Sequence, residues 1–171
     1  QPRHPVALAQ QALTASAMSN GRFTLGIGLS HKVVIEGMYG LSFDKPAKIM
    51  REYLAVTNPL LNRKTAKHQG DMYNVHMGLD IPDAVTPVPT MIAAMGPMML
   101  GLAGAATDGT ILWMTGPKTI EEYVRPTMES AAEKAGRPTP RTMAAFPVLL
   151  TNDEAAGRAL IGEQLVHYGQ L

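Results

Sequence analysis

The sequence predicts an α/β protein in which short strands and helices alternate around a parallel sheet. Apolar runs of strand length recur along the chain, and each of the first three leads into a glycine-containing loop. Helical segments separate these runs, as expected for β/α units joined by crossover connections. With 171 residues and 46% hydrophobic content, the chain is sufficient for one domain with a sizeable core.

Four elements are expected in the first half of the chain, and two of them have clear boundary signals. Pro5 suits the first turn of the opening helix, and Gly21 ends that helix. Asp44 is expected to cap the second helix. The predicted elements are a helix over residues 4–21, a strand over 23–27, a loop over 31–43 and a helix over 45–62.

The second half is expected to continue the alternation after a hairpin or loop excursion over residues 63–86. Gly96-Pro97 separates a strand from a helix, because proline suits the first position of a helix. Thr119 is expected to cap a later helix that Pro126 kinks or offsets, and Asn152 or Asp153 to cap the final helix. The predicted strands cover residues 88–95, 110–114 and 141–151, and the helices cover 98–106, 120–136 and 152–171.

Between Ala84 and Thr107 the chain carries no charged residue, and this stretch is long enough to cross a bilayer. Pro87, Pro89 and the Gly96-Pro97 pair interrupt it, so a buried strand followed by a helix is the better interpretation. We therefore expect no membrane span. The first residues also lack the apolar core of a signal peptide, which favours a cytoplasmic protein.

Composition excludes several classes of function. The net charge of +1, without basic or acidic blocks, gives no support for nucleic-acid binding. There are no cysteines, and the five histidines show no metal-ligand spacing, so no metal site is expected. Methionines far outnumber phenylalanines, and the excess is expected to fill the core.

Ligands of parallel β/α folds gather at the carboxyl ends of the strands, which places the candidate site in the loops after them. Gly96 allows close approach of the backbone, and the helix that starts at Pro97 would offer free amides to an anion. The alternative is an ordinary strand-to-helix turn, which needs glycine and proline in any case. The sequence therefore leaves open whether this loop binds a phosphate or acidic group.

The loops after two other strands carry further candidates. Trp113 could form the wall of an aromatic ligand site, Thr115 could donate a hydrogen bond and Lys118 could meet an anion. His31 could act as a proton donor or hydrogen-bond partner. Each of these residues could instead be a core or surface side chain. Because no nucleophile or acid pair is evident, the pattern fits an enzyme whose cofactor carries the chemistry.

Two segments together resemble the luciferase-like flavin or deazaflavin (coenzyme F420) oxidoreductases. Residues 3–31, "RHPVALAQQALTASAMSNGRFTLGIGLSH", resemble the block in which a helix leads into the fourth barrel strand of that family. Residues 87–124 resemble the next strand, its helix and the following strand. The pairing of "AAMGPMMLGLAG" with "DGTILWMTGP" is the specific part, and "GLSH" followed by "GMYG" resembles the F420-dependent branch.

The resemblance implies a (β/α)8 TIM-type barrel, with the cofactor ring over the carboxyl ends of the strands. It implies hydride transfer to or from F420 on a small organic substrate, with FMN-dependent monooxygenation as the alternative. His31 would be the catalytic residue. The implied cofactor-binding residues are Gly28, Ser30, Ala94, Met95, Gly96, Pro97, Trp113, Thr115, Gly116 and Lys118.

Only about half of the eight β/α units are apparent, so we expect a single partial barrel domain over residues 1–171. The chain lacks an initiator methionine and starts almost directly at a helix, which suggests a cut segment. A partial barrel leaves open sheet edges, and we expect a homo-oligomer or completion of the sheet by another chain. A non-catalytic cofactor-binding protein is the remaining alternative.

Overall fold

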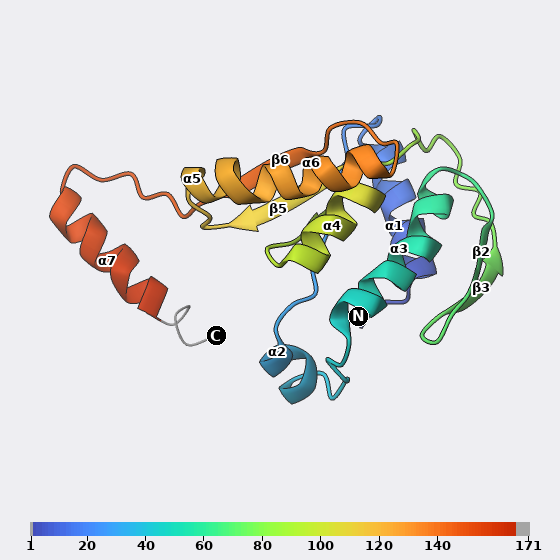
Figure 1. Ribbon diagram of the computed structural model, residues 1–171, viewed down its shortest axis with the longest axis horizontal. Helices are drawn as coiled ribbons and strands as arrows, with labels where there is room; N and C mark the ends of the chain where they lie inside the picture. Colours follow the sequence, from blue (N-terminus) through green and yellow to red (C-terminus); the bar gives the residue numbers. More distant parts are fainter. Residues whose placement is uncertain (1, 167–171) are drawn as a thin grey trace.

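The computed structural model describes residues 2–166 and shows an α/β arrangement with a parallel sheet (Figure 1). The strands are β1 (Leu25–Ile27), β2 (Ala66–Gln69), β3 (Asn74–Met77), β4 (Thr90–Ala93), β5 (Gly109–Trp113) and β6 (Arg141–Ala145). The α-helices are α1 (Pro5–Met18), α2 (Lys32–Gly37), α3 (Pro46–Leu61), α4 (Pro97–Ala106), α5 (Pro117–Thr119), α6 (Arg125–Lys134) and α7 (Glu154–Val166).

Four strands form one sheet in the order β1-β4-β5-β6, and every neighbouring pair is parallel. Ile27 of β1 aligns with Ile92 of β4, which aligns with Thr110 of β5. The Thr110 hydroxyl reinforces this alignment by donating a hydrogen bond of 2.8 Å to the carbonyl of Ile92. The prediction of parallel β/α units is confirmed, and the carboxyl ends of the strands share one edge of the sheet.

The core lies between the sheet and the helices on one of its faces. One cluster joins α1, α3 and β1 around Leu13, Leu25 and Leu60. A second cluster packs α3, α4 and α6 against β4 and β5, with Ile92 and Leu112 at its centre. Both clusters follow from the apolar faces of the helices, because each helix must bury its apolar side chains against a neighbouring element.

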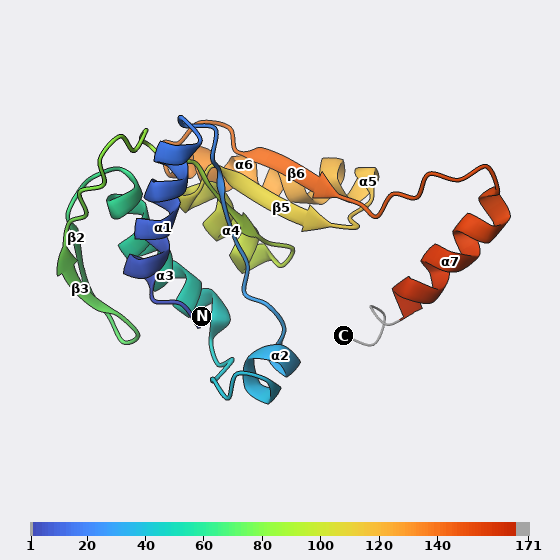
Figure 2. The same ribbon diagram turned by 180° about the vertical axis from the view of Figure 1, so that it is seen from behind.

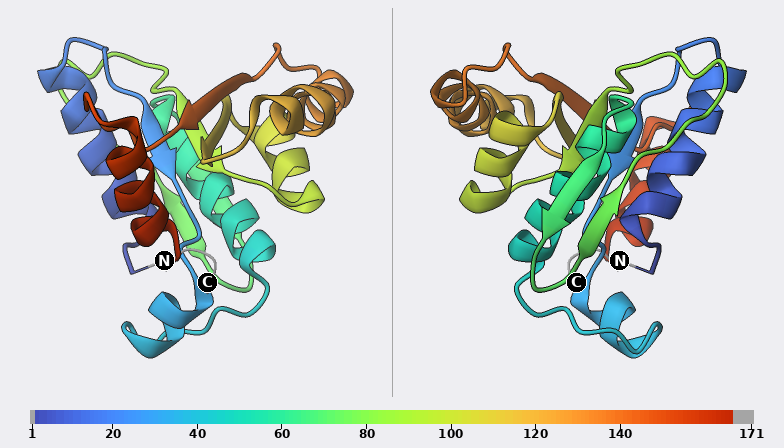
Figure 3. Two further views of the ribbon diagram at one scale, coloured as in Figure 1. Left: turned by 90° about the vertical axis from the view of Figure 1, so that its left-hand side faces the viewer. Right: turned by 90° about the vertical axis from the view of Figure 1, so that its right-hand side faces the viewer.

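The segment over residues 63–86 contains a two-stranded antiparallel ribbon, formed by β2 and β3, outside the main sheet. This ribbon runs beside α3, as both views in Figure 3 show. Gly70 and Tyr73 close its turn, with the Gly70 N–H donating to the carbonyl of Tyr73 at 3.0 Å. The turn lies near the start of α3, on the same side of the molecule as the carboxyl end of β1 (Figure 1).

Several predicted boundaries between residues 31 and 124 are wrong. Residues 31–43 contain the short helix α2, which is anchored by Ile35 with only 1% of its surface exposed. Asp44 does not cap α3, because Lys45 occupies the capping position in a left-handed conformation with φ of 49°. Helix formation after β5 begins at Pro117, so Thr119 lies within the helix rather than capping it. A π-helical turn over Ile120–Val124 precedes α6.

The last predicted strand is shorter than expected, and the chain leaves the sheet after Ala145. Residues 146–153 form no helix or strand, and Leu150 is 99% exposed. Asp153 caps the final helix as predicted by accepting the N–H of Ala156 at 2.9 Å. Helix α7 stands apart from the other helices in Figure 2, and the predicted continuation over residues 167–171 lies outside the described residues.

The expectation that methionine fills the core is wrong for most of these residues. Only Met50, Met91 and Met128 of the twelve methionines are buried. Several exposed ones, including Met95 and Met98, lie at the carboxyl edge of the sheet. Flexible methionine side chains are common on surfaces that adapt to a ligand, so their position indicates a binding surface as much as a packing role.

The stretch between Ala84 and Thr107 folds as β4 and α4, as its proline and glycine residues predict. Among residues 2–166, the structure contains no helix long and apolar enough to cross a membrane.

The crossing of α4 and α6 predicts opposite effects for two glycine substitutions in α4. A Cβ at Gly104 would lie 2.2 Å from the carbonyl oxygen of Met128, whereas a Cβ at Gly101 would meet nothing within 4 Å. Gly104→Ala should lower the free energy of unfolding by on the order of 1–3 kcal/mol through overpacking. Gly101→Ala should raise it by up to about 1 kcal/mol because alanine favours the helix. Urea unfolding measures both, and equal effects would contradict the close crossing.

We propose that the 171-residue chain on its own associates through its sheet. Within residues 2–166, β1 and β6 each pair on one side only. Ala93, Ile111 and Met143 lie side by side on the face opposite the buried Ile92 and Leu112, and Met143 is exposed on that face. Open edges beside apolar side chains favour pairing with another chain. Light scattering should therefore show oligomers at micromolar concentration, and a stable, cooperatively unfolding monomer would contradict the proposal.

Candidate functional site

The structure brings most of the predicted site residues to one edge of the sheet. Because β1, β4 and β5 are parallel neighbours, the loops that follow them leave the same edge of the sheet. A Cβ at Gly28, just after β1, would lie 3.6 Å from the Cβ of Ala93 at the end of β4. The loops after β1, β4 and β5 are therefore neighbours, and together they form the candidate site.

The loop between β4 and α4 presents the start of a helix to open space. Gly96 is the N-cap of α4 in an extended conformation, Pro97 is the first helical residue, and no side chain caps the helix. The amides of the first turn have no partner within the helix, which leaves them available to an acceptor. A Cβ at Gly96 would meet nothing within 4 Å, so the described chain leaves open space beside the N-cap. This geometry suits an acidic or phosphate group.

A hydrogen bond links this loop to the loop after β5. Thr115, only 6% exposed, has its hydroxyl 3.4 Å from the sulfur of Met95 and equally far from the carbonyl of Trp113. The side chains of Met95 and Trp113 are each 46% exposed. The two loops thus hold an apolar surface beside the start of α4. Ala94 is buried and packs in the cluster beneath this surface.

Gly116 repeats the arrangement of Gly96 one strand further along, because it caps a helix that starts at a proline and has open space at its Cβ position. Lys118 is exposed and lies 3.9 Å from Glu122 one turn later. The ammonium group of Lys118 thus already has a carboxylate neighbour. The role of Lys118 in binding an anion stays a prediction.

The loop after β1 places its polar candidates at the surface. Ser30 adopts a left-handed conformation with φ of 62°, and His31 is the N-cap residue of α2 without making a side-chain cap. Both side chains are exposed. His31 is therefore accessible to a ligand at this edge, and its catalytic role remains a prediction.

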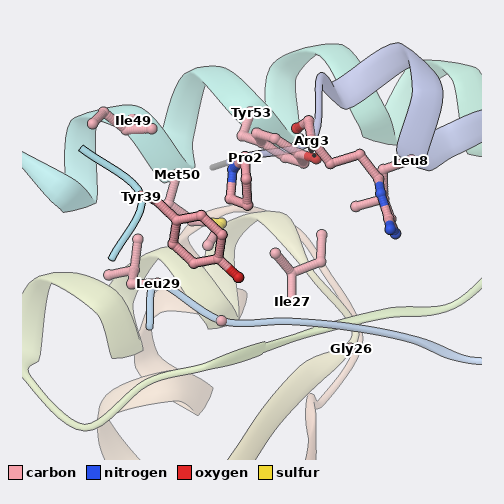
Figure 4. Close-up of a pocket in the computed structure, with 11 residues that line it drawn as sticks. Pro2, Arg3, Leu8, Gly26, Ile27, Leu29, Tyr39, Ile49, Met50 and Tyr53 are labelled. Atoms are coloured by element: carbon pink, nitrogen blue, oxygen red, sulfur yellow. Dashed lines mark hydrogen bonds between the residues drawn. The ribbon is translucent and has the colours of Figure 1, made fainter. Parts of the chain in front are cut away.

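A cavity of about 420 Å³ lies next to this loop, between β1, α1 and α3 (Figure 4). Gly28 is the only predicted site residue that lines it. The residues that the sequence analysis missed come from the first residues, the loop after β1, the loop after α2 and the apolar face of α3. They include Arg3, Leu29, Tyr39, Met50 and Tyr53.

Two tyrosines define the polar features of this cavity. The Tyr53 hydroxyl donates a hydrogen bond of 3.0 Å to the carbonyl of Arg3, and burial raises the pKa of Tyr53 to about 12. Tyr53 therefore stays protonated at neutral pH and fixes the start of the chain over the cavity. Tyr39 extends its ring and hydroxyl into the cavity from the loop after α2 (Figure 4). Met50 and Tyr53 lie on the apolar face of α3, and such a position predicts packing and gives no signal of a cavity.

Within residues 2–166, no group of three or more histidine, aspartate or glutamate side chains could hold a metal ion. The site consists of a helix N-terminus, exposed apolar side chains and scattered hydrogen-bonding groups. Such a site suits an organic cofactor that has a flat ring and an acidic tail.

The sequence profile of the luciferase-like monooxygenases matches residues 1–170. The chain belongs to this family. It is 34% identical over 132 residues to the 5,10-methylenetetrahydromethanopterin reductase of Archaeoglobus fulgidus, covering 74% of the chain and 39% of that protein. It is 28% identical over 163 residues to the F420-dependent glucose-6-phosphate dehydrogenase of Amycolatopsis mediterranei, covering 92% of the chain and 48% of that protein.

The solved structures agree with the sequence relatives. The coenzyme F420-dependent tetrahydromethanopterin reductase of Methanopyrus kandleri matches with a TM-score of 0.70 and 25% identity, over 90% of this chain and 49% of that one. The predicted α/β class of TIM-barrel type is thus confirmed, and the chain spans about half the length of the relatives that it matches. Distant relatives of the chain use F420.

Proposed function

We propose that this chain is the cofactor-binding portion of an F420-dependent oxidoreductase that transfers hydride between the deazaflavin and a small organic substrate. The observation that carries the proposal is the uncapped start of α4 at Gly96, next to the apolar surface of Met95 and Trp113. The F420-dependent relatives support it. When bound, F420 supplies or accepts the hydride, and the residues of the chain bind and orient the reactants.

The proposed roles follow from the position of each residue. The first-turn amides of α4 bind an acidic group of the cofactor tail, and Gly96 lets that group approach. Met95 and Trp113 contact the ring, while the Thr115 hydroxyl holds their two loops together. His31, at the accessible end of β1, donates a proton or a hydrogen bond at the reacting centre.

An FMN-dependent monooxygenase is the second candidate, because the matching family is named for monooxygenases. The Gly96 loop would accept the phosphate of FMN by the same geometry, so the loop alone does not separate the two cofactors. A third candidate is a protein that binds the cofactor without catalysing a reaction.

Titration of the chain with F420 and with FMN, followed by their fluorescence, tests the proposed cofactor. We expect micromolar binding of F420 and weaker binding of FMN, because the dehydrogenase of Amycolatopsis mediterranei and the reductase of Methanopyrus kandleri are F420-dependent. Preferential binding of FMN would overturn the assignment. Oxidation of reduced F420 in the presence of a candidate carbonyl substrate then distinguishes an enzyme from a protein that only binds the cofactor.

Gly96→Val should weaken cofactor binding by on the order of 1–3 kcal/mol, because a branched side chain would stand between the amides of α4 and their ligand. The fold should tolerate the change, since the Cβ meets nothing within 4 Å and the backbone is extended at this position. Gly101→Ala, one turn further along the same helix, is the control. An unchanged dissociation constant in a folded Gly96→Val protein would show that the loop is only a turn.

A further inference from the structure

A second cavity, of about 550 Å³, lies between the loop before α3, the first turn of α3 and the turn of the β2–β3 ribbon. Leu41, Ile49, Met72 and Tyr73 give it largely apolar walls. Ile49 lines the first cavity as well, so the two cavities are neighbours. The rings of Tyr73 and Tyr53 also meet edge to face, with centroids 5.7 Å apart.

One wall of this second cavity is held in place by a buried carboxylate. Glu52 of α3 is 8% exposed and accepts the backbone N–H groups of Met72 at 2.9 Å and of Tyr73 at 3.3 Å. The Met72 N–H is the main reason that the pKa of Glu52 lies below its usual range, with a further contribution from His68. The carboxylate is therefore ionised at neutral pH, and it fixes the turn against α3.

Gly70 lets the turn approach this carboxylate. A Cβ at Gly70 would lie 2.3 Å from Oε2 of Glu52 and 2.6 Å from Nε2 of His68. On the same ribbon, a Cβ at Gly78 would have its nearest neighbour, the Thr65 hydroxyl, at an ordinary 3.7 Å. The missing side chain of Gly70 therefore allows the cavity wall to take its position, whereas a side chain at Gly78 would not disturb the wall.

The charges around this cavity compensate one another. Lys48 forms an ion pair with Asp71, and their hydrogen bond raises the pKa of Lys48 and lowers that of Asp71. The other two charged lining residues, Asp44 and Lys45, are adjacent in the chain and opposite in sign. The four charged lining residues thus carry no net charge, so a charged ligand would find no excess of opposite charge here. An uncharged apolar molecule would bury apolar surface without separating the Lys48–Asp71 pair.

We propose that this second cavity is a separate binding site for an uncharged, mainly apolar organic molecule. The proposal goes beyond the proposed function, because none of the residues placed at the cofactor lines this cavity. The molecule enters between the start of α3 and the ribbon turn. Glu52 is a positioning residue, since it sets the wall formed by Met72 and Tyr73 without itself lining the cavity.

The test measures binding to the cavity without any cofactor, so its result is separate from that of the cofactor titration. The chain is labelled with [methyl-¹³C]methionine, and Met72→Leu identifies the Met72 signal. Cyclohexanol is the uncharged probe and cyclohexanecarboxylate is its charged counterpart of similar shape. We expect cyclohexanol to shift the Met72 signal saturably, with binding at least fivefold tighter than that of the carboxylate. The Met18 signal, from an exposed residue of α1, should not move.

Gly70→Ala should weaken cyclohexanol binding at least threefold and speed amide exchange at Met72 and Tyr73, while Gly78→Ala should change neither. If Gly70→Ala does not fold, Leu41→Asp places a charge on the opposite wall and should produce the same loss, with Val33→Asp on α2 as its control. An unmoved Met72 signal, tighter binding of the carboxylate, or equal effects of a variant and its control would each overturn the proposal.

Discussion

The parallel pairing of β4 with β1 on one side and β5 on the other is the constraint on which the candidate site depends. It places the residues after Ile27, Ala93 and Trp113 at one edge, although they are far apart in the sequence. The hydrogen bond from Thr110 to the carbonyl of Ile92 holds the register, and the packing of α4 and α6 covers one face. A shift in register would move the loops relative to one another and flip their side chains.

The sequence was sufficient to predict the elements of this sheet because their signals are local. A short apolar run followed by glycine and proline describes β4 and α4 in any context, and the same pattern recurs at β5. Helix α2 had no such signal, because only Ile35 anchors its six residues. Lys45 takes a left-handed conformation before Pro46, where a sequence rule favours Asp44 as a cap. Tertiary packing, rather than local conformational preference, determines the structure of such short segments.

The cavities were not predictable, because a side chain that lines a cavity follows the same pattern as one that fills the core. Met50 and Tyr53 lie on the apolar face of α3, and both are buried, yet they also border open space. The link between Glu52 and the ribbon turn joins residues about twenty positions apart through backbone amides. Nearly every residue has a backbone N–H group, so the sequence does not indicate which of them will donate to Glu52. Only the coordinates show that this carboxylate on a helix holds a distant turn.

The glycines show how the structure separates packing from binding where the sequence treats both alike. At Gly104 and Gly109 a Cβ would lie within 2.2 Å of a carbonyl oxygen of the chain itself, so these glycines serve the fold. At Gly96 and Gly116 the described chain leaves the space empty. Openness alone is not specific, since Gly101 is equally open. Gly96 and Gly116 differ because each precedes a helix start at the strand edge, where free amides need an acceptor that the described chain does not provide.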